Sequence, residues 1–123
     1  MKLIEYSDSY KTNINNYFLT EEMTYYTGIP KDCIAISKEK PSFHSILAFS
    51  DNNELVTFFV LDEGEDKTLY TDNLNSMLLR SFSTDSHHIK KGFAKEALGL
   101  LADFVRVNFP HINEIVLAVN EKN

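Results

Sequence analysis

The spacing of apolar positions changes along the chain and predicts which segments are strands and which are helices. Residues 3–6 form a short, mainly apolar run that predicts an opening strand. Apolar residues then recur at three- and four-residue spacing, as on one face of a helix: Tyr10, Ile14, Tyr17 and Phe18. The chain is therefore expected to begin with a strand followed by a helix.

Two further helices are predicted by residues that start and stop helical segments. Thr20 precedes two acidic residues, which is typical of an N-cap followed by a first turn that favours negative charge. Gly28 is expected to end this short helix. Pro30, a residue that commonly occupies the first helical position, then opens another helix.

A β hairpin is predicted in the middle of the chain. Residues 45–50 and 55–61 are apolar runs of strand length, and residues 51–53 form the turn between them. The second run is too apolar for an exposed edge strand. Residues 62–75 are acidic and polar, so we interpret them mainly as a surface connection.

The C-terminal half has the order strand, loop, helix, strand. Residues 77–82 predict a strand, the polar segment 84–88 interrupts it, and Pro110 limits the next helix to about Asn108. One stripe of this helix is apolar and is expected to lie on the sheet: Ala94, Ala97, Leu98, Leu101, Phe104 and Val105. The run 115–119 is continuously apolar, which predicts a strand covered on both faces.

Composition indicates one folded domain and argues against several classes of partner. The 123 residues are 43% hydrophobic and 24% charged, enough for a single core spanning residues 1–123. The formal net charge of −6 argues against a nucleic-acid or anionic-membrane partner, because both need a basic face. The N-terminus lacks the apolar run of a signal peptide, and no run is long enough to cross a membrane. A cytoplasmic location is expected.

Cysteine and histidine positions predict neither a disulfide nor a metal site. Cys33 is the single cysteine, and its apolar helical neighbourhood is typical of a buried, inert thiol. No cysteine and histidine spacing suggests zinc. His87 and His88 could contact a phosphate or act as bases, but in a polar loop we favour the interpretation that they are solvated.

The segment from Ser83 to Lys95 has the order strand, loop, helix start, which makes an anion site. The first turn of a helix has free backbone N–H groups and the positive end of the macrodipole, so it attracts phosphate oxygens. Gly92 and Ala94 remove bulk from this turn. Three lysines place positive charge there in an otherwise acidic chain: Lys90, Lys91 and Lys95.

The hexapeptide Ile89-Lys90-Lys91-Gly92-Phe93-Ala94 resembles the pyrophosphate signature of the GNAT N-acetyltransferases, Gln/Arg-x-x-Gly-x-Gly/Ala. The flanking segments 78–82, 95–98 and 117–120 are similar to the family as well. The resemblance implies an α+β fold with a mixed, mainly antiparallel sheet and flanking helices. Residues 1–123 would be the GNAT core from its first to its fifth strand, lacking the family's C-terminal helix and hairpin.

The resemblance also implies acetyl-CoA as cosubstrate and a primary amine as acceptor. Strands 77–83 and 115–119 would splay apart around the pantetheine arm, and the loop 89–95 would hold the pyrophosphate. The cofactor-binding residues expected on this basis are Phe82, Ser83, Thr84, Ile89, Lys90, Lys91, Gly92, Phe93, Ala94, Lys95 and Asn120. Tyr25 and Tyr26 could line the acceptor pocket, although a core position is more common for such a pair.

Two departures from the family pattern affect the expected chemistry. Ile89 stands where the family has Gln or Arg, which should weaken cofactor binding without removing a backbone donor. The tyrosine that serves relatives as general acid falls in the C-terminal segment that this chain is expected to lack. The catalytic residues are therefore unknown, with Asp62, Glu63 or a water chain as possible bases. Arg80 could bind substrate, but an outward position on a strand is the favoured interpretation.

The sequence is compatible with three functions. The first is N-acetyl transfer to an amine, the second is a truncated or degenerate relative that binds CoA without catalysis, and the third is a domain that only assembles. The apolar run 115–119 would form an exposed edge, so a homo-oligomer through this strand is expected.

Overall fold

The computed structural model describes residues 1–117, which form one five-stranded sheet with the strand order β1-β2-β3-β4-β5. The first four strands are antiparallel neighbours, and β4 pairs with β5 in parallel. The strands are β1 (Lys2–Glu5), β2 (Phe43–Phe49), β3 (Leu55–Asp62), β4 (Ser76–Thr84) and β5 (Glu114–Leu117). The predicted mixed, mainly antiparallel sheet is confirmed.

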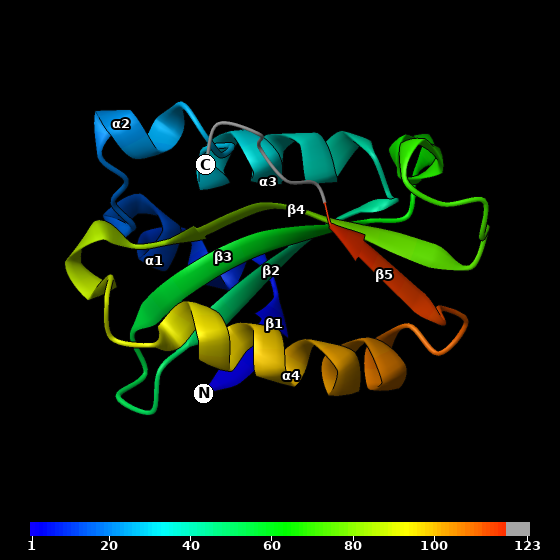
Figure 1. Cartoon of the computed structure of the whole chain (residues 1–123). Helices are drawn as coiled ribbons and strands as arrows, with labels where there is room; N and C mark the ends of the chain where they lie inside the picture. The colour runs from blue at the N-terminus through cyan, green and yellow to red at the C-terminus, as the bar shows by residue number, and fades with distance from the viewer. Residues whose placement is uncertain (118–123) are drawn as a thin grey trace.

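Helices cover both faces of this sheet, as Figure 1 shows. One face carries α1 (Lys11–Asn16), α2 (Glu21–Thr24) and α3 (Pro30–Glu39), and the other carries α4 (Phe93–Asn108). Three 3-10 turns complete the set: η1 (Asp8–Tyr10), η2 (Glu65–Leu69) and η3 (Ser86–His88). The predicted helix starts are confirmed, since the Thr20 hydroxyl accepts a 3.2 Å hydrogen bond from the Met23 N–H and Pro30 opens α3.

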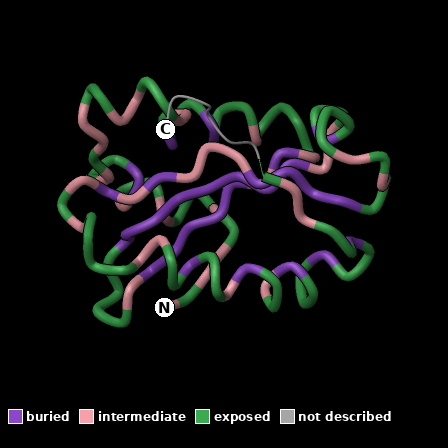
Figure 2. The backbone as a smooth tube through the Cα atoms, viewed as in Figure 1, coloured by how far each residue is buried: buried purple, intermediate pink, exposed green. Residues whose placement is uncertain are grey.

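The sheet separates two apolar cores because successive strand residues point to opposite faces. The α3-side core includes Leu47, Phe58 and Val60, and the α4-side core includes Ile46, Phe59 and Leu61. Figure 2 shows the buried residues concentrated along the central strands. A strand buried on both faces is the reason that β3 has no polar alternation, as its composition predicted.

The strand β5 is less covered than its apolar run predicted. Glu114 and Leu117 are exposed, and only Ile115 packs against the α4-side core. Among residues 1–117, β5 is an edge strand with α4 on one face, so the expectation of burial on both faces is wrong. Leu98 is also exposed, because it lies at the margin of the α4 stripe whose buried positions are Ala97, Leu101 and Val105.

The connection 62–75 is not entirely on the surface. Lys67 is 8% exposed, and its ammonium group donates to the carbonyl oxygens of Leu74 at 2.7 Å and Ser76 at 3.0 Å. These bonds tie η2 to the start of β4. The expectation that the connection 62–75 lies on the surface is therefore wrong for Lys67, whose hydrogen bonds hold the connection against the sheet.

A β-bulge interrupts β4 at the place where β5 stops pairing with it. Phe58 pairs with Ser83 and Val60 with Arg80, so two residues of β4 lie opposite one residue of β3. Ser81 in this bulge has φ of +54°. Pairing with β5 ends at Leu79 opposite Leu117, so from Arg80 to Thr84 this edge of β4 has no strand partner among residues 1–117.

Candidate active site

The loop that follows β4 presents backbone donors at the start of a long helix. Gly92 is the N-cap residue of α4 with φ of +84° and makes no side-chain cap, and Lys90 has φ of +63°. The first helical hydrogen bond runs from the Glu96 N–H to the Gly92 carbonyl at 3.0 Å. The N–H groups of residues 93–95 precede that bond and point out of the first turn, as an anion site requires.

Charge around this turn is positive although the chain is acidic. Lys90, Lys91 and Lys95 are exposed beside the turn. Glu96 is the acidic residue of the first helical turn. The N-terminal amine lies 3.4 Å from the Glu96 carboxylate, and its positive charge offsets the negative charge of Glu96. Ile89, where the family signature has a polar residue, is 45% exposed.

The edge of β4 that has no strand partner among residues 1–117 is followed by η3 and then by the loop 89–95. Phe82 points toward the α4 side, where its ring stacks on Phe59 with 5.6 Å between centroids. Ser83 is buried, and the Thr84 hydroxyl lies 3.3 Å from the Thr57 hydroxyl. The side chains of residues 82–84 thus make contacts within the protein. A ligand at this edge would therefore bind mainly to the backbone of residues 82–84.

The bulge packs tightly on the α3 side of the sheet. A β-carbon added to Gly28 would lie 3.0 Å from both the Cys33 sulfur and the Ser81 hydroxyl, so the connection between α2 and α3 lies against the bulge. Cys33 is 4% exposed, and this burial raises the pKa of its thiol. The prediction that this cysteine is buried is confirmed.

Arg80, one residue before the bulge, is held in an ion-pair network. Its Nη1 lies 3.1 Å from the Asp62 carboxylate and 2.8 Å from the Asp66 carboxylate, and its guanidinium carbon lies 5.8 Å from the Phe43 ring centroid. Partial burial would lower the pKa of Arg80, but hydrogen bonds and charge from Asp66 and Asp62 outweigh it and raise that pKa. The Arg80 side chain is thus partly exposed, at 33%, and is held by two carboxylates.

Comparison with known proteins agrees with this geometry. No family model matches the chain. A curated relative, the uncharacterized N-acetyltransferase YbbJ of Bacillus subtilis (strain 168), is 29% identical over 118 residues, covering 96% of this chain and 74% of its own length. A GNAT family acetyltransferase of Staphylococcus aureus has a TM-score of 0.65 at 18% identity, covering all of this chain and 90% of that one. The chain has the GNAT fold.

Further GNAT structures share the fold at low identity. The aminoglycoside acetyltransferase AAC(6')-Iy, solved with the bisubstrate analogue CoA-S-monomethyl-acetylneamine, has a TM-score of 0.68 at 13% identity over 99% of this chain and 81% of that one. A ribosomal-protein-alanine N-acetyltransferase of Brucella melitensis biovar Abortus 2308 has a TM-score of 0.64 at 17% identity, covering 98% and 80%. The fold class inferred from the sequence is confirmed.

Both carboxylates considered as a general base are engaged in hydrogen bonds. Asp62 is 5% exposed and accepts from Arg80 and from the Gly64 N–H at 2.8 Å. Glu63 lies between His44 at 2.7 Å and His111 at 2.5 Å. Partial burial would raise the pKa of Glu63, but hydrogen bonds from His111 and His44 prevail and lower it, so Glu63 stays ionised within this cluster.

Three polar residues at the end of β4 make contacts that the sequence did not reveal. The Tyr17 hydroxyl lies 2.8 Å from the Ser83 hydroxyl, and burial raises the pKa of Tyr17 well above its ordinary value. Asp85 is 4% exposed and accepts from the Phe18 N–H. The only sequence signal for Asp85 was its place before Ser86 and His87, where Asp commonly caps a turn.

The expected environments of His87, His88 and the tyrosine pair are found only in part. The His87 side chain is 71% exposed, as expected, but that of His88 is 17% exposed and packs 6.0 Å from the Phe93 ring. The expectation that His88 is solvated is therefore wrong, because the Phe93 ring and the Glu54 carboxylate lie beside it. Tyr25 and Tyr26 are exposed, so the core position expected for them is wrong.

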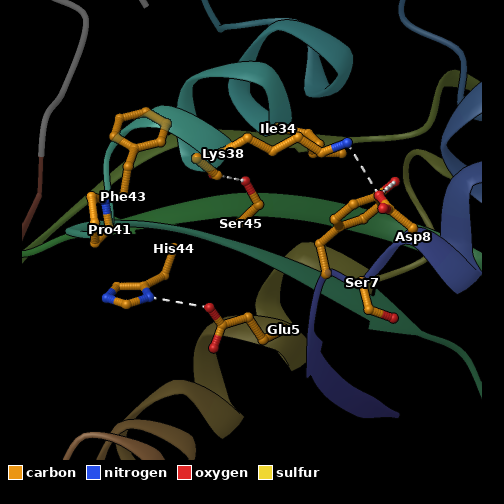
Figure 3. A pocket seen from close by; sticks show the side chains of 11 residues that line it. Glu5, Ser7, Asp8, Ile34, Lys38, Pro41, Phe43, His44 and Ser45 are labelled. Carbon is orange, nitrogen blue, oxygen red and sulfur yellow. Dashed lines mark hydrogen bonds and ion pairs between the residues drawn. The ribbon is translucent and has the colours of Figure 1, made fainter.

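A cavity of about 390 Å³ lies elsewhere on this GNAT fold, between α3 and the paired strands β1 and β2. Figure 3 shows Lys38 directed toward Asp8 and His44 directed toward Glu5 at its sides, with Ser45 on β2. Neither β4 nor the loop 89–95 contributes a residue to its lining. Its size alone does not make it the site of GNAT chemistry.

Within residues 1–117, no cluster of three or more potential ligands could hold a metal ion. None of the helices described is long and apolar enough to cross a membrane. Asn120, expected to bind the cofactor, lies outside the described residues, as do Ala118 and Val119 of the predicted last strand.

Proposed function

We propose that the protein is an acetyl-CoA-dependent N-acetyltransferase that transfers the acetyl group directly to a primary amine. One observation carries this proposal: the edge of β4 from Arg80 to Thr84 has no strand partner among residues 1–117, and the chain then continues to a left-handed turn at Gly92 that begins α4. A pantetheine arm could pair with the edge of β4, and a pyrophosphate could bind at the turn around Gly92. Similarity to a named N-acetyltransferase and to structures with the GNAT fold supports the same function.

The residues present suit this ligand. Apart from Gly92 itself and its two chain neighbours, no heavy atom lies within 4 Å of a β-carbon added to Gly92, so the space over the turn is open to a phosphate. We assign the pyrophosphate to the backbone of residues 89–95, with Lys90, Lys91 and Lys95 supplying charge. We assign the pantetheine amides to the backbone of residues 82–84.

Acetyl transfer forms a bond from the amine nitrogen to the acetyl carbon and breaks the bond from that carbon to sulfur. The amine must be neutral to attack, and the departing thiolate must gain a proton. A backbone N–H near Phe82 is suited to polarise the thioester carbonyl as negative charge develops on its oxygen. The two protein carboxylates considered, Asp62 and Glu63, are engaged elsewhere, so water is the proposed carrier of the amine proton.

This engagement favours a second candidate, a GNAT relative that binds CoA without catalysis. Calorimetric titration with acetyl-CoA tests cofactor binding, and thiol release with a panel of primary amines tests transfer. Binding with transfer supports the enzyme, and binding without transfer to any amine supports the second candidate. No binding of acetyl-CoA would contradict both.

A further inference from the structure

Two segments far apart in sequence are joined at the end of β4 from which the loop 89–95 departs. The Phe18 N–H donates to Asp85 Oδ2 at 2.8 Å, and the Ser86 N–H donates back to the Phe18 carbonyl at 2.7 Å. Tyr17 and Ser83 share a further hydrogen bond of 2.8 Å. The connection after α1 and the segment after β4 are therefore fixed to each other on both sides of Asp85.

The carboxylate of Asp85 is the centre of this junction. Its Oδ1 accepts from the His87 N–H at 2.8 Å and from His87 Nδ1 at 2.9 Å, while Oδ2 accepts from Phe18. A carboxylate only accepts, so Nδ1 of His87 carries the proton and Nε2 is left toward solvent. The Phe18 and His87 rings also lie 5.5 Å apart.

We propose that Asp85 is a positioning residue that sets the loop 89–95 for acetyl-CoA and makes that loop and the Tyr17–Phe18 segment a single unit. The inference rests on the proposed function. Asp85 does not touch the cosubstrate; it acts through His87 and the few residues that follow. The expected consequence is that acetyl-CoA binding also orders the backbone at Phe18.

The loop itself explains why an anchor is needed at this point. Gly92 provides no side-chain cap, and Lys90 and Gly92 both have positive φ, so local hydrogen bonding does little to hold the turn. Downstream, α4 is fixed by buried residues such as Ala97. Upstream, Asp85 provides the fixed point, since its own N–H donates to the Val56 carbonyl at 2.9 Å.

One substitution separates the two roles of the Asp85 carboxylate, which are the hydrogen bond to Phe18 and the capping of the turn at His87. Asp85→Ser retains a hydroxyl that can cap the His87 N–H, but it is too short to reach Phe18 as well. Asp85→Asn keeps the shape and removes one acceptor, and it serves if the serine variant does not fold. Ser45→Ala is the matched control, because Ser45 is 2% exposed and its hydrogen bond of 2.6 Å to Ser37 lies away from the loop.

Calorimetry with acetyl-CoA measures the outcome on the wild-type protein and on each variant. Asp85→Ser is expected to weaken Kd about tenfold, as loss of a charge-assisted hydrogen bond would, with an unchanged stoichiometry. A purely structural role would lower the fraction of competent protein, and hence the stoichiometry, without moving Kd. Ser45→Ala is expected to leave Kd unchanged while lowering thermal stability.

Hydrogen exchange gives an independent readout of the coupling. Acetyl-CoA should slow exchange at the Phe18 and Ser86 amides in the wild-type protein, and this protection should be lost at Phe18 in Asp85→Ser. If the wild-type protein binds acetyl-CoA and Asp85→Ser and Asp85→Asn bind with the same Kd, the inference is overturned. If the wild-type protein does not bind acetyl-CoA at all, the proposed function fails instead.

Discussion

The hydroxyl groups of Tyr17 and Ser83 lie 2.8 Å apart although 66 positions separate the two residues in sequence. Tyr17 belongs to the connection that follows α1, and Ser83 belongs to the buried end of β4. Both hydroxyls are largely shielded from water, so each satisfies the hydrogen-bonding need of the other. This pair helps to align the helical side of the fold with the strand that carries the candidate site.

Tyr17→Phe is expected to lower the free energy of unfolding by about 1 kcal/mol, because it leaves the Ser83 hydroxyl without this partner. Urea denaturation of both proteins measures the difference. The double variant Tyr17→Phe with Ser83→Ala should recover part of the loss, since neither hydroxyl is then buried alone. Equal stability of Tyr17→Phe and wild type would show that water replaces this bond.

The cluster around Glu63 predicts a loss of stability in acid. The pKa of Glu63 is lowered below the model-peptide value of 4.5, chiefly by hydrogen bonds from His111 and His44 that outweigh its partial burial. A carboxyl with a lowered folded-state pKa stabilises the protein above its unfolded value, and this contribution is lost as pH falls through the folded value. Melting temperatures between pH 6 and pH 3 should therefore fall more in wild type than in Glu63→Gln. Parallel curves would contradict the cluster.

Local sequence signals predicted the elements because the physics of their ends is local. The Thr20 hydroxyl bonds three residues away, Pro30 opens the helix it belongs to, and the turn at Asn53 with φ of +62° closes the hairpin it belongs to. The motif around Gly92 also depends on adjacent residues only. These features could be predicted without knowing what lies across the sheet.

Contacts between distant residues could not be predicted in the same way. The burial of Lys67 depends on two carbonyls that only an irregular connection brings to its ammonium group. The role of Asp85 depends on the Phe18 amide 67 residues earlier. Leu98 matched the spacing of the apolar stripe but lies where the sheet no longer covers α4. Each of these outcomes is set by tertiary position rather than by residue type.

Arg80→Met should destabilise the protein because it leaves the buried Asp62 carboxylate with one partner fewer. Asp62 keeps its bond to the Gly64 N–H, so a cost of about 1–3 kcal/mol is expected. Lys95→Met, which removes an exposed positive charge, is the control and should change stability little. A loss of the same size in both variants would contradict a specific Arg80–Asp62 pair.

A homo-oligomer through strand 115–119 stays a prediction. Among residues 1–117, β5 is the edge strand beside β4 and Leu117 is 54% exposed, so this edge is suited to pair with a second copy. Light scattering at micromolar concentration should give the mass of a dimer or a larger assembly. Leu117→Lys should split it without unfolding, because the side chain is exposed. A wild-type monomer would contradict the prediction.

Substitution of Gly92 tests whether the backbone of the loop binds phosphate. Gly92 has φ of +84°, and apart from Gly92 and its two chain neighbours no heavy atom lies within 4 Å of an added β-carbon, so the protein itself does not exclude a side chain there. Two effects remain, namely strain of the left-handed conformation and obstruction of a phosphate that approaches the backbone. Gly92→Val should therefore weaken acetyl-CoA binding far more than Lys91→Ala, which removes one exposed and screened charge.

Gly99→Ala is the matched control for this experiment, since Gly99 is also free of neighbours within 4 Å but lies inside α4 without a left-handed φ. It should stabilise the helix by about 0.5–1 kcal/mol and leave acetyl-CoA binding unchanged. Calorimetry and thermal melting of the three variants separate strain from obstruction, because strain lowers stability even when no ligand is present. Equal Kd values for Gly92→Val and Lys91→Ala would mean that the lysine charge, rather than the open backbone at Gly92, governs binding.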